Sequence, residues 1–209
     1  MTPSLLSINV GHPERVGNGL SGINKQRVVS ARLTTEGVEG DAILNRNHHG
    51  GPDQAVYIYF QHDYDFWERE LGRWLRPGLF GENLTITGID ATDIAVGDRF
   101  RIGEALLEVT YHRTPCGTFG AQMGEPSWVK RFQQARRPGA YARVLNEGTV
   151  QTGDAVHYTP FDGTKVRVSA LMALDGVREI DVETLRWALS APIREKTRAK
   201  YEALLAGIA

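Results

Sequence analysis

The residues best suited to chemistry lie around Cys116, the only cysteine among 209 residues. Arg113 lies three positions before it, and a nearby cation lowers the pKa of a thiol. A thiolate is both a nucleophile and a soft metal ligand. Cysteines outside disulfides are more often buried and inert, so a small apolar residue in a turn is an equally acceptable interpretation of this stretch alone.

The residues on either side of Cys116 predict how it is positioned. Residues 105–111 alternate apolar and polar side chains, which is typical of a half-buried strand. Pro115 has no backbone donor, and Gly117 permits a sharp turn. We therefore expect Cys116 to follow the end of a strand on a constrained loop.

Further candidate residues lie in three other loops. Lys25 stands where a glycine-rich loop leads into a strand, so it is either a surface lysine or a contact for an anionic ligand. Glu82 and Asn83 interrupt an apolar run just before a short strand, either to form a turn or to grip a ligand.

The third loop, residues 48–54, contains His49 and Asp53 beside two glycines and a proline. Adjacent histidines invite a zinc interpretation, but neither an H-E-x-x-H pattern nor paired cysteines accompany them. The glycines instead favour a backbone shaped for close approach to another group. A tight loop in which His49 and Asp53 bond to the backbone is the alternative.

Composition limits the kind of protein. Hydrophobic content of 41% and charged content of 23% are ordinary for a globular protein, and a net charge of −1 argues against a nucleic-acid polymer as partner. No apolar run approaches the ~20 residues of a membrane span, and no signal peptide is evident. One cysteine allows neither an internal disulfide nor a four-cysteine iron–sulfur cluster, so we expect a cytoplasmic protein.

The pattern of elements changes near residue 160. Before it, short strands separated by glycine-rich turns predict a β-barrel or sandwich, including one strand over residues 27–34 with Val29 and Leu33 on the same face. Helices are expected over residues 61–74, with Trp74 facing the core, and over residues 125–137. After it, three helices are expected, the second capped by Asp181 and the third with Pro192 in its first turn. These helices must dock on the barrel, on a second subunit in a homodimer, or on a partner.

Six segments in order resemble the MOSC domain, the module related to the C-terminal part of molybdenum cofactor sulfurases, in its stand-alone, YiiM-like form. The resemblance spans about residues 4–160, and the remainder looks like the three-helix extension found in the same group. The segments are VEGD (38–41), HGGPDQAV (49–56), FGENLT (80–85), VGD (96–98), RTPC (113–116) and GTVQTGD (148–154).

The resemblance implies a mainly β fold. Residues 1–160 would form a MOSC-type β-barrel with a few helices, and residues 161–209 a C-terminal three-helix extension. It also implies that the barrel binds the molybdenum cofactor, a molybdopterin. Cys116 would be the metal ligand and the catalytic residue. The other cofactor-binding residues would be Arg113, Thr114, Asn83, Glu82, Lys25, His49 and Asp53.

The activity implied by the resemblance is reduction of N-hydroxylated small molecules such as hydroxylamino-purines, a detoxifying role. The chain has neither the ligands for an iron–sulfur cluster nor a dinucleotide fingerprint, so electrons would come from an external flavin or haem reductase. The alternative is a non-catalytic carrier in which Cys116 holds cofactor or a persulfide sulfur. A third hypothesis, a cysteine hydrolase using His112 or His49 as the base, lacks a carboxylate placed to orient that base.

Overall fold

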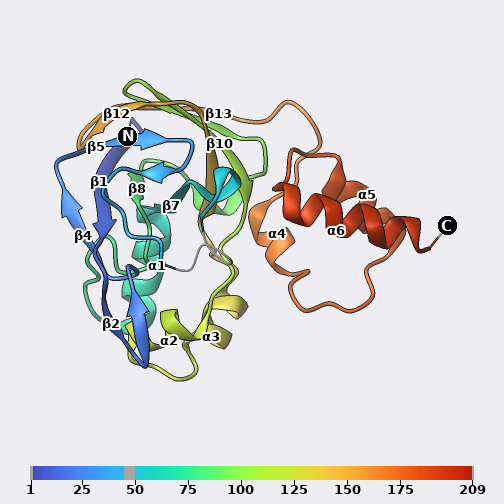
Figure 1. Ribbon diagram of the computed structural model, residues 1–209, viewed down its shortest axis with the longest axis horizontal. Helices are drawn as coiled ribbons and strands as arrows, with labels where there is room; N and C mark the ends of the chain where they lie inside the picture. The colour runs from blue at the N-terminus through green and yellow to red at the C-terminus, as the bar shows by residue number, and fades with distance from the viewer. Residues whose placement is uncertain (1, 45–49, 209) are drawn as a thin grey trace.

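The computed structural model describes residues 2–44 and 50–208, so His49 lies outside the described residues. An eight-stranded sheet forms its centre, in the order β13-β9-β10-β11-β7-β8-β1-β4. Figure 1 shows this sheet in one body with helices α1–α3, and helices α4–α6 beside that body. The strands of the main sheet, in chain order, are β1 (Ser4–Gly11), β4 (Lys25–Val28), β7 (Val56–Phe60), β8 (Leu84–Thr87), β9 (Arg99–Ile102), β10 (Ala105–Tyr111), β11 (Ala140–Asn146) and β13 (Val156–Thr159).

Two smaller sheets and six helices complete the described elements. The first small sheet has the order β12-β5-β6, and the second is the β2–β3 hairpin. The small strands are β2 (Glu14–Val16), β3 (Gly19–Ser21), β5 (Ser30–Thr34), β6 (Gly37–Val38) and β12 (Gly148–Gln151). The helices are α1 (Gln61–Leu71), α2 (Gly117–Met123), α3 (Trp128–Ala135), α4 (Val168–Met172), α5 (Val182–Leu189) and α6 (Glu195–Ala206), with short 3₁₀ turns η1 (Pro52–Gln54) and η2 (Ala91–Asp93).

The sheet-rich fold agrees with the sequence-based prediction, but the closed barrel is not confirmed. The main sheet has two ends, β13 and β4. A single bridge pairs Ser4 with Ala155, which lies just before β13. Strand β4, at the other end of the sheet, takes no part in this bridge. The chain continues from β4 into β5, which pairs with β12 in a different sheet.

The predicted strand over residues 27–34 is in fact two strands. β4 ends at Val28 and β5 begins at Ser30, while Val29 between them is 79% exposed and does not share a buried face with Leu33. The alternation of side chains continues through the break, so it could not reveal the change of pairing partner. The preceding glycine-rich segment, expected to be a loop, contains the β2–β3 hairpin.

Two helices also differ from the prediction. α1 ends at Leu71 because Gly72 adopts a left-handed conformation with φ 64°, and Trp74, expected in the core, is 73% exposed. Helix α2 begins directly after Cys116, where only a turn was expected. α3 accounts for the predicted helix over residues 125–137.

An aromatic cluster joins α1, α2 and α3 to one face of the sheet. Phe80 stacks on Tyr59 with ring centroids 4.6 Å apart, and it contacts Phe119 of α2 edge-on at 5.9 Å. Trp67 of α1 lies 4.8 Å from Trp128 of α3. Aromatic pairs at these separations are favourable beyond the area they bury, so the cluster fixes α2, and with it the residues that precede α2, against the sheet.

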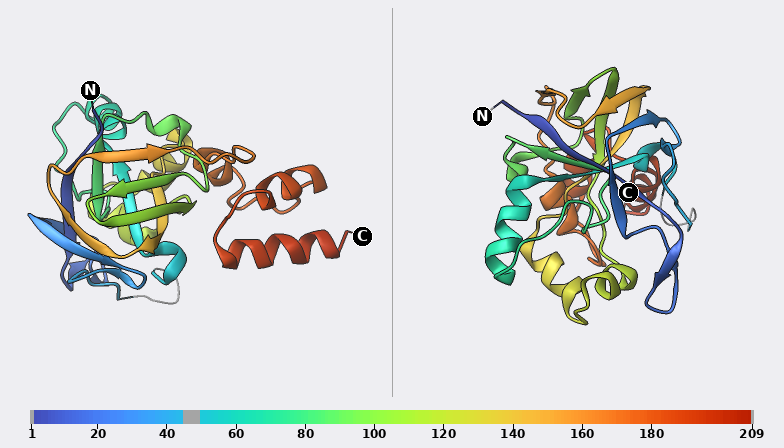
Figure 2. Two further views of the ribbon diagram at one scale, coloured as in Figure 1. Left: turned by 90° about the horizontal axis from the view of Figure 1, so that it is seen from above. Right: turned by 90° about the vertical axis from the view of Figure 1, so that its left-hand side faces the viewer.

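The C-terminal helices pack on the main core. Val166, Leu171, Leu185 and Ile193 belong to the same buried apolar cluster as the strands β1, β7 and β10. Figure 2 shows α5 and α6 extending away from the sheet, with α4 nearer to it. Asp181 caps α5 by accepting a hydrogen bond from the backbone of Thr184 at 2.8 Å, which confirms that prediction.

Pro192 precedes α6 instead of lying in its first turn. The division of the chain into residues 1–160 and 161–209 stays a prediction. Within the described ranges, no helix combines the length and apolar character needed to cross a membrane.

Candidate functional site

A cavity of about 190 Å³ lies between the β2–β3 hairpin, the segment after β6, strand β7 and the residues on either side of α2's start. It brings together four of the predicted site residues, Lys25, Asn83, Arg113 and Cys116. These residues come from three separate stretches of sequence, so the fold makes Lys25 and Asn83 neighbours of the segment that carries Arg113 and Cys116.

Cys116 occupies the position just before α2, where its half-buried side chain lines the cavity. Strand β10 ends at Tyr111, and the next five residues cross to α2 in non-helical conformation. Phe119, one turn into α2, is fully buried in the aromatic cluster. The thiol therefore lies between a central strand and an anchored helix. This placement agrees with the prediction of a constrained loop that follows a strand.

Arg113 is a buried cation in the cavity wall. Its Nη1 donates a 2.5 Å hydrogen bond to the carbonyl of Phe80, and its guanidinium lies over the Phe119 ring at 4.2 Å. Burial alone would lower the pKa of Arg113, but Tyr57, Tyr141 and Cys116 raise it above its ordinary value, so the charge persists. A guanidinium buried beside a thiol offers donors to an anionic group.

Gly81 makes room for this guanidinium. It has φ 77°, and a Cβ at this position would lie 3.2 Å from Nη1 of Arg113 and 2.9 Å from Ile23. A side chain here would therefore have to displace one of them. The glycine of the Gly81-Glu82-Asn83 stretch thus has a spatial role in the cavity that sequence reasoning did not assign.

Lys25, Asp41 and Asn83 form a buried polar group in the wall of the cavity. Lys25 Nζ lies 2.5 Å and 2.6 Å from the two carboxylate oxygens of Asp41. Asn83 Nδ2 donates to Asp41 Oδ2 at 2.9 Å, while its Oδ1 accepts from the Tyr57 backbone at 3.1 Å. The pKa of Lys25 lies below the ordinary lysine value because burial outweighs the attraction of Asp41.

Asp41 is a site residue that sequence reasoning missed as a candidate, although it ends the VEGD segment of the family resemblance. Its carboxylate also accepts a 2.6 Å hydrogen bond from the backbone of Gly11. Tyr57 and Tyr141, on neighbouring strands β7 and β11, line the cavity too and were not predicted. Their positions follow from strand pairing, which a single sequence does not specify.

Glu82 lies behind the cavity wall and does not line it. Its Oε1 accepts hydrogen bonds from Tyr64 Oη and the Gly78 backbone, both at 2.6 Å, and from Thr85 Oγ1 at 2.8 Å. Burial raises the pKa of this carboxyl above its ordinary value. Of the two proposed roles, the contacts of Glu82 correspond to forming the turn.

Thr114 and Asp53 also lie away from the cavity lining. Thr114 is exposed and donates to Asp175 Oδ2 at 3.0 Å. Asp53 accepts from the backbone of Glu195 at 2.6 Å and forms an ion pair with Arg143 at 3.0 Å. Both side chains turn toward the C-terminal helices, because the loops that carry them lie between those helices and the cavity.

The cysteine-hydrolase hypothesis gains no support from the described residues. His112 is fully buried, is not among the residues that line the cavity, and has Nε2 3.4 Å from Asp175 Oδ1. His49, the other candidate base, is not among the described residues.

The fold and the cavity define a sheet-rich protein whose sole cysteine lines a pocket together with a buried arginine. The chain belongs to the MOSC domain family, which matches residues 45–157. This match confirms the family resemblance found in the sequence, and the YiiM proteins described in the next paragraph confirm its YiiM-like form. The uncharacterized protein YflK of Bacillus subtilis is 40% identical over 155 residues, which cover 72% of this chain and 70% of YflK.

Two further relatives extend the comparison. Protein YiiM of Escherichia coli is 40% identical over 135 residues, 62% of this chain and 60% of YiiM. A protein named reductase from Gibberella moniliformis is 32% identical over 124 residues, 57% of this chain and 22% of that protein. The crystal structure of YiiM from Geobacillus stearothermophilus superposes with a TM-score of 0.80 at 25% identity, covering 97% of this chain and 99% of that one.

Proposed function

We propose that this chain binds the molybdenum cofactor in the cavity beside Cys116 and reduces N-hydroxylated small molecules. The observation that carries the proposal is the cavity itself, which places the only cysteine of the chain beside a buried arginine. Membership of the MOSC domain family supports association with the molybdenum cofactor in general. The reductase name of the fungal relative supports oxidoreductase chemistry in general.

The residues that line the cavity fit an anionic cofactor. Lys25 and Arg113 are cations and Asp41 is the one carboxylate among the described lining residues. Asp41 holds Lys25, which leaves Arg113 as the cation facing the cavity without an opposing carboxylate there. Its Nε is buried with no hydrogen-bond partner in the described part of the chain. A buried donor left unsatisfied is costly, and a phosphate or other anion would satisfy it.

The thiol of Cys116 fits a metal that brings most of its own ligands. Among the described residues, no group of three or more histidine, cysteine, aspartate or glutamate side chains could hold an ion. Cys116 would therefore supply a single thiolate, an electron-rich ligand for a high-valent metal. Arg113 would bind an anionic part of the cofactor. Asn83 and Asp41 would hold the cavity wall in its shape, because their polar atoms already form hydrogen bonds to protein groups.

The bound cofactor would supply the two-electron chemistry that cleaves an N–O bond. Overall, an N-hydroxylated compound takes up two electrons and two protons and leaves as an amine and water. The protein would orient the substrate against the cofactor and exclude water from the cavity. The electrons would come from an external flavin or haem reductase.

The experiment is expression in a host that makes the cofactor, followed by molybdenum and pterin analysis of the purified chain. Cys116→Ser should keep the fold and lose molybdenum, because a serine hydroxyl stays protonated and is a poor ligand. Arg113→Gln should lose pterin as well, whereas Arg101→Gln, which changes an exposed arginine on β9, should lose neither. A Cys116→Ser protein with full cofactor would refute the assignment of the metal ligand.

Turnover separates the enzyme from the carrier, the second candidate function. The half-buried thiol in the cavity wall would also suit a protein that holds cofactor or a persulfide sulfur for transfer. Loaded protein should reduce a hydroxylamino-purine when a reduced viologen supplies electrons. Stoichiometric molybdenum without turnover, with any electron donor, would favour the carrier.

A further inference from the structure

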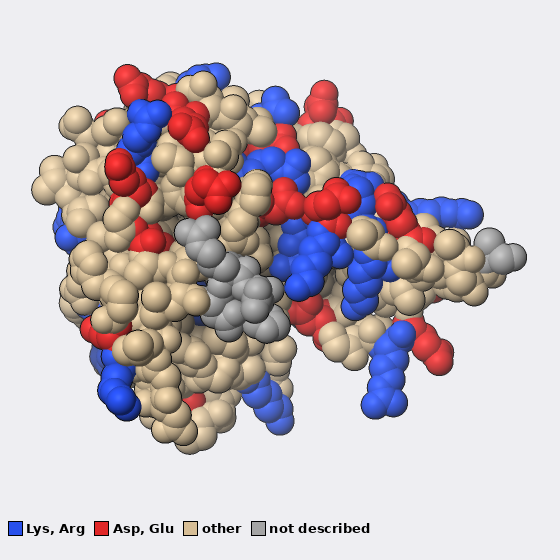
Figure 3. All heavy atoms as spheres, in the orientation of Figure 1, with Lys and Arg blue, Asp and Glu red and all other residues tan. Residues whose placement is uncertain are grey.

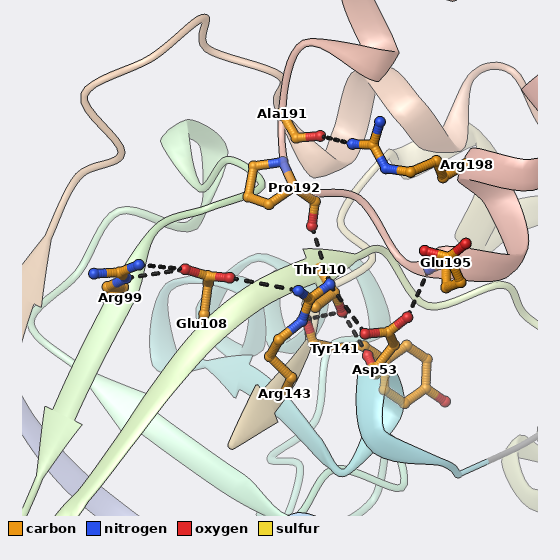
Figure 4. Close-up of polar contacts among 10 residues, drawn as sticks. All are labelled: Asp53, Arg99, Glu108, Thr110, Tyr141, Arg143, Ala191, Pro192, Glu195 and Arg198. Atoms are coloured by element: carbon orange, nitrogen blue, oxygen red, sulfur yellow. Dashed lines mark hydrogen bonds and ion pairs between the residues drawn. The ribbon is translucent and has the colours of Figure 1, made fainter. Parts of the chain in front are cut away.

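The loop that carries Asp53 connects the cavity to the C-terminal helices. Gly50, Gln54 and Ala55 line the cavity, and the Asp53 carboxylate between them points the other way. Figure 4 shows Asp53 between Arg143 and the start of α6, where it accepts the Glu195 backbone N–H at 2.6 Å. The ion pair with Arg143 joins Asp53 Oδ1 at 3.0 Å.

Arg143 continues this contact into the turn before α6. Its Nη2 donates to the carbonyl of Pro192 at 3.2 Å, and its Nη1 lies 3.7 Å from Glu108 of β10. Arg198 of α6 donates to the carbonyl of Ala191 at 2.7 Å, which closes the turn from the other side (Figure 4). Strand, loop and helix are thus joined by charge-assisted hydrogen bonds, which are the stronger kind.

A second contact reaches the loop that carries Cys116. Asp175, between α4 and α5, accepts from Thr114 Oγ1 at 3.0 Å and lies 3.4 Å from Nε2 of the buried His112. The backbone of Arg194 donates to the carbonyl of Thr110 at 3.2 Å, and its guanidinium covers the Tyr111 ring at 3.6 Å. Figure 3 shows acidic and basic side chains gathered along this border between the sheet-rich body and the C-terminal helices.

We propose that Asp53 and Asp175 are positioning residues through which the C-terminal segment, residues 161–208, fixes the two loops of the cavity. Asp53 holds the wall formed by residues 50–55, and Asp175 holds the residues just before Cys116. The proposal rests on the proposed function, because it concerns the same cavity. It gives the C-terminal helices a role in shaping a binding site that they do not line.

The test measures the two loops directly in the full chain without cofactor. Hydrogen exchange is followed in residues 50–57 and 111–118, and iodoacetamide reports how fast the Cys116 thiol is modified. Asp53→Ala should speed exchange in residues 50–57. Asp175→Ala should speed exchange in residues 111–118 and change the rate of thiol modification. Each change should be about tenfold, the ratio expected for losing one hydrogen bond to a charged group.

Asp181→Ala is the matched control, because Asp181 caps α5 in the same segment without touching either loop. This variant should lower thermal stability and leave hydrogen exchange in both loops unchanged. The proposal would be overturned if hydrogen exchange in the loops stayed unchanged in both test variants, or if it changed equally in Asp181→Ala. If an alanine variant fails to fold, Asp53→Asn and Asp175→Asn keep the shape and remove the charge. Since no cofactor is present, failure of molybdenum binding would not affect these results.

Discussion

Asp41 organises the polar side of the cavity. Its carboxylate accepts hydrogen bonds from Gly11, Lys25 and Asn83, so it ties β1, β4 and the start of β8 to one point. A buried carboxylate is tolerated because these donors replace the water it has lost. Lys25 is therefore paired with the protein's own carboxylate, and its contact with a cofactor stays a prediction.

The Lys25–Asp41 pair should behave as a buried ion pair in mutation. Lys25→Met leaves the Asp41 carboxylate buried without its cation and should lower the free energy of unfolding by about 3–5 kcal/mol. The double variant Lys25→Met, Asp41→Asn should regain part of this loss, because the unpaired charge is gone. Urea unfolding of both single variants and the double variant measures the coupling. Additive losses would contradict a direct pairing.

Asp63 should make stability fall as pH rises. Burial raises its pKa to about 6, although Arg137 pairs with it at 2.8 Å. Between the ordinary aspartate pKa of 3.8 and about 6, the folded protein keeps a proton that the unfolded chain has released, so unfolding is increasingly favoured. The stability of the wild type relative to Asp63→Asn should fall by up to about 3 kcal/mol across this window. Denaturation from pH 4 to pH 7 checks this, and a constant difference would refute it.

The site could be predicted only in part, for a physical reason. Lys25, Asn83, Arg113 and Cys116 line the cavity, whereas Glu82, Thr114 and Asp53 do not. Neighbours in a motif, such as Thr114 beside Arg113, point to different sides of a loop. Which side faces the cavity depends on packing partners such as Asp175, which lies far away in sequence.

The elements were predicted where the pattern matched the pairing or the packing, as in the alternation of β10 and the helical period of α5. The break at Val29 and helix α2 were missed because both depend on tertiary partners. β5 leaves the main sheet to pair with β12, and α2 is held by Phe119 in the aromatic cluster. Local sequence carries little information about either contact.

The connection before β11 depends on Gly139. It has φ 62°, and a Cβ there would lie 2.5 Å from the Ile58 carbonyl of β7. Gly139→Ala should therefore lower the free energy of unfolding by about 3 kcal/mol or more, because the left-handed strain adds to a steric clash with the backbone. Gly72→Ala is the control, since Gly72 has φ 64° with nothing within 4 Å, and the substitution should lower the free energy of unfolding by only about 1 kcal/mol, the left-handed strain alone. Thermal unfolding of both would compare them, and equal losses would contradict the role of the clash.

In the whole molecule, the sheet that carries the candidate site and the C-terminal helices share one apolar core. The proposed reaction needs electrons, and the sequence contains neither an iron–sulfur ligand set nor a dinucleotide fingerprint. We therefore propose that an external flavin or haem reductase delivers the electrons to the cavity.

The cofactor-loaded chain should not reduce an N-hydroxylated purine with NADH or NADPH alone. Hydride donors need a flavin or a similar group to pass electrons to a metal. Adding a flavin reductase or a reduced viologen should start turnover, and Cys116→Ser should abolish it while the reductase stays active. Amine formation from NADPH by the isolated chain would contradict the need for a partner.

The bridge between Ser4 and Ala155 sets an order of events during synthesis. The backbone of Leu5 donates to the carbonyl of Asp154 at 2.9 Å, so the first strand finds this partner only after some 150 later residues have left the ribosome. Contacts this distant in sequence slow folding because a long loop must close first. The backbone of β1 near Leu5 stays unpaired on this side in the meantime, and a molecular chaperone that covers exposed strands would protect the newly made chain until residue 155 arrives.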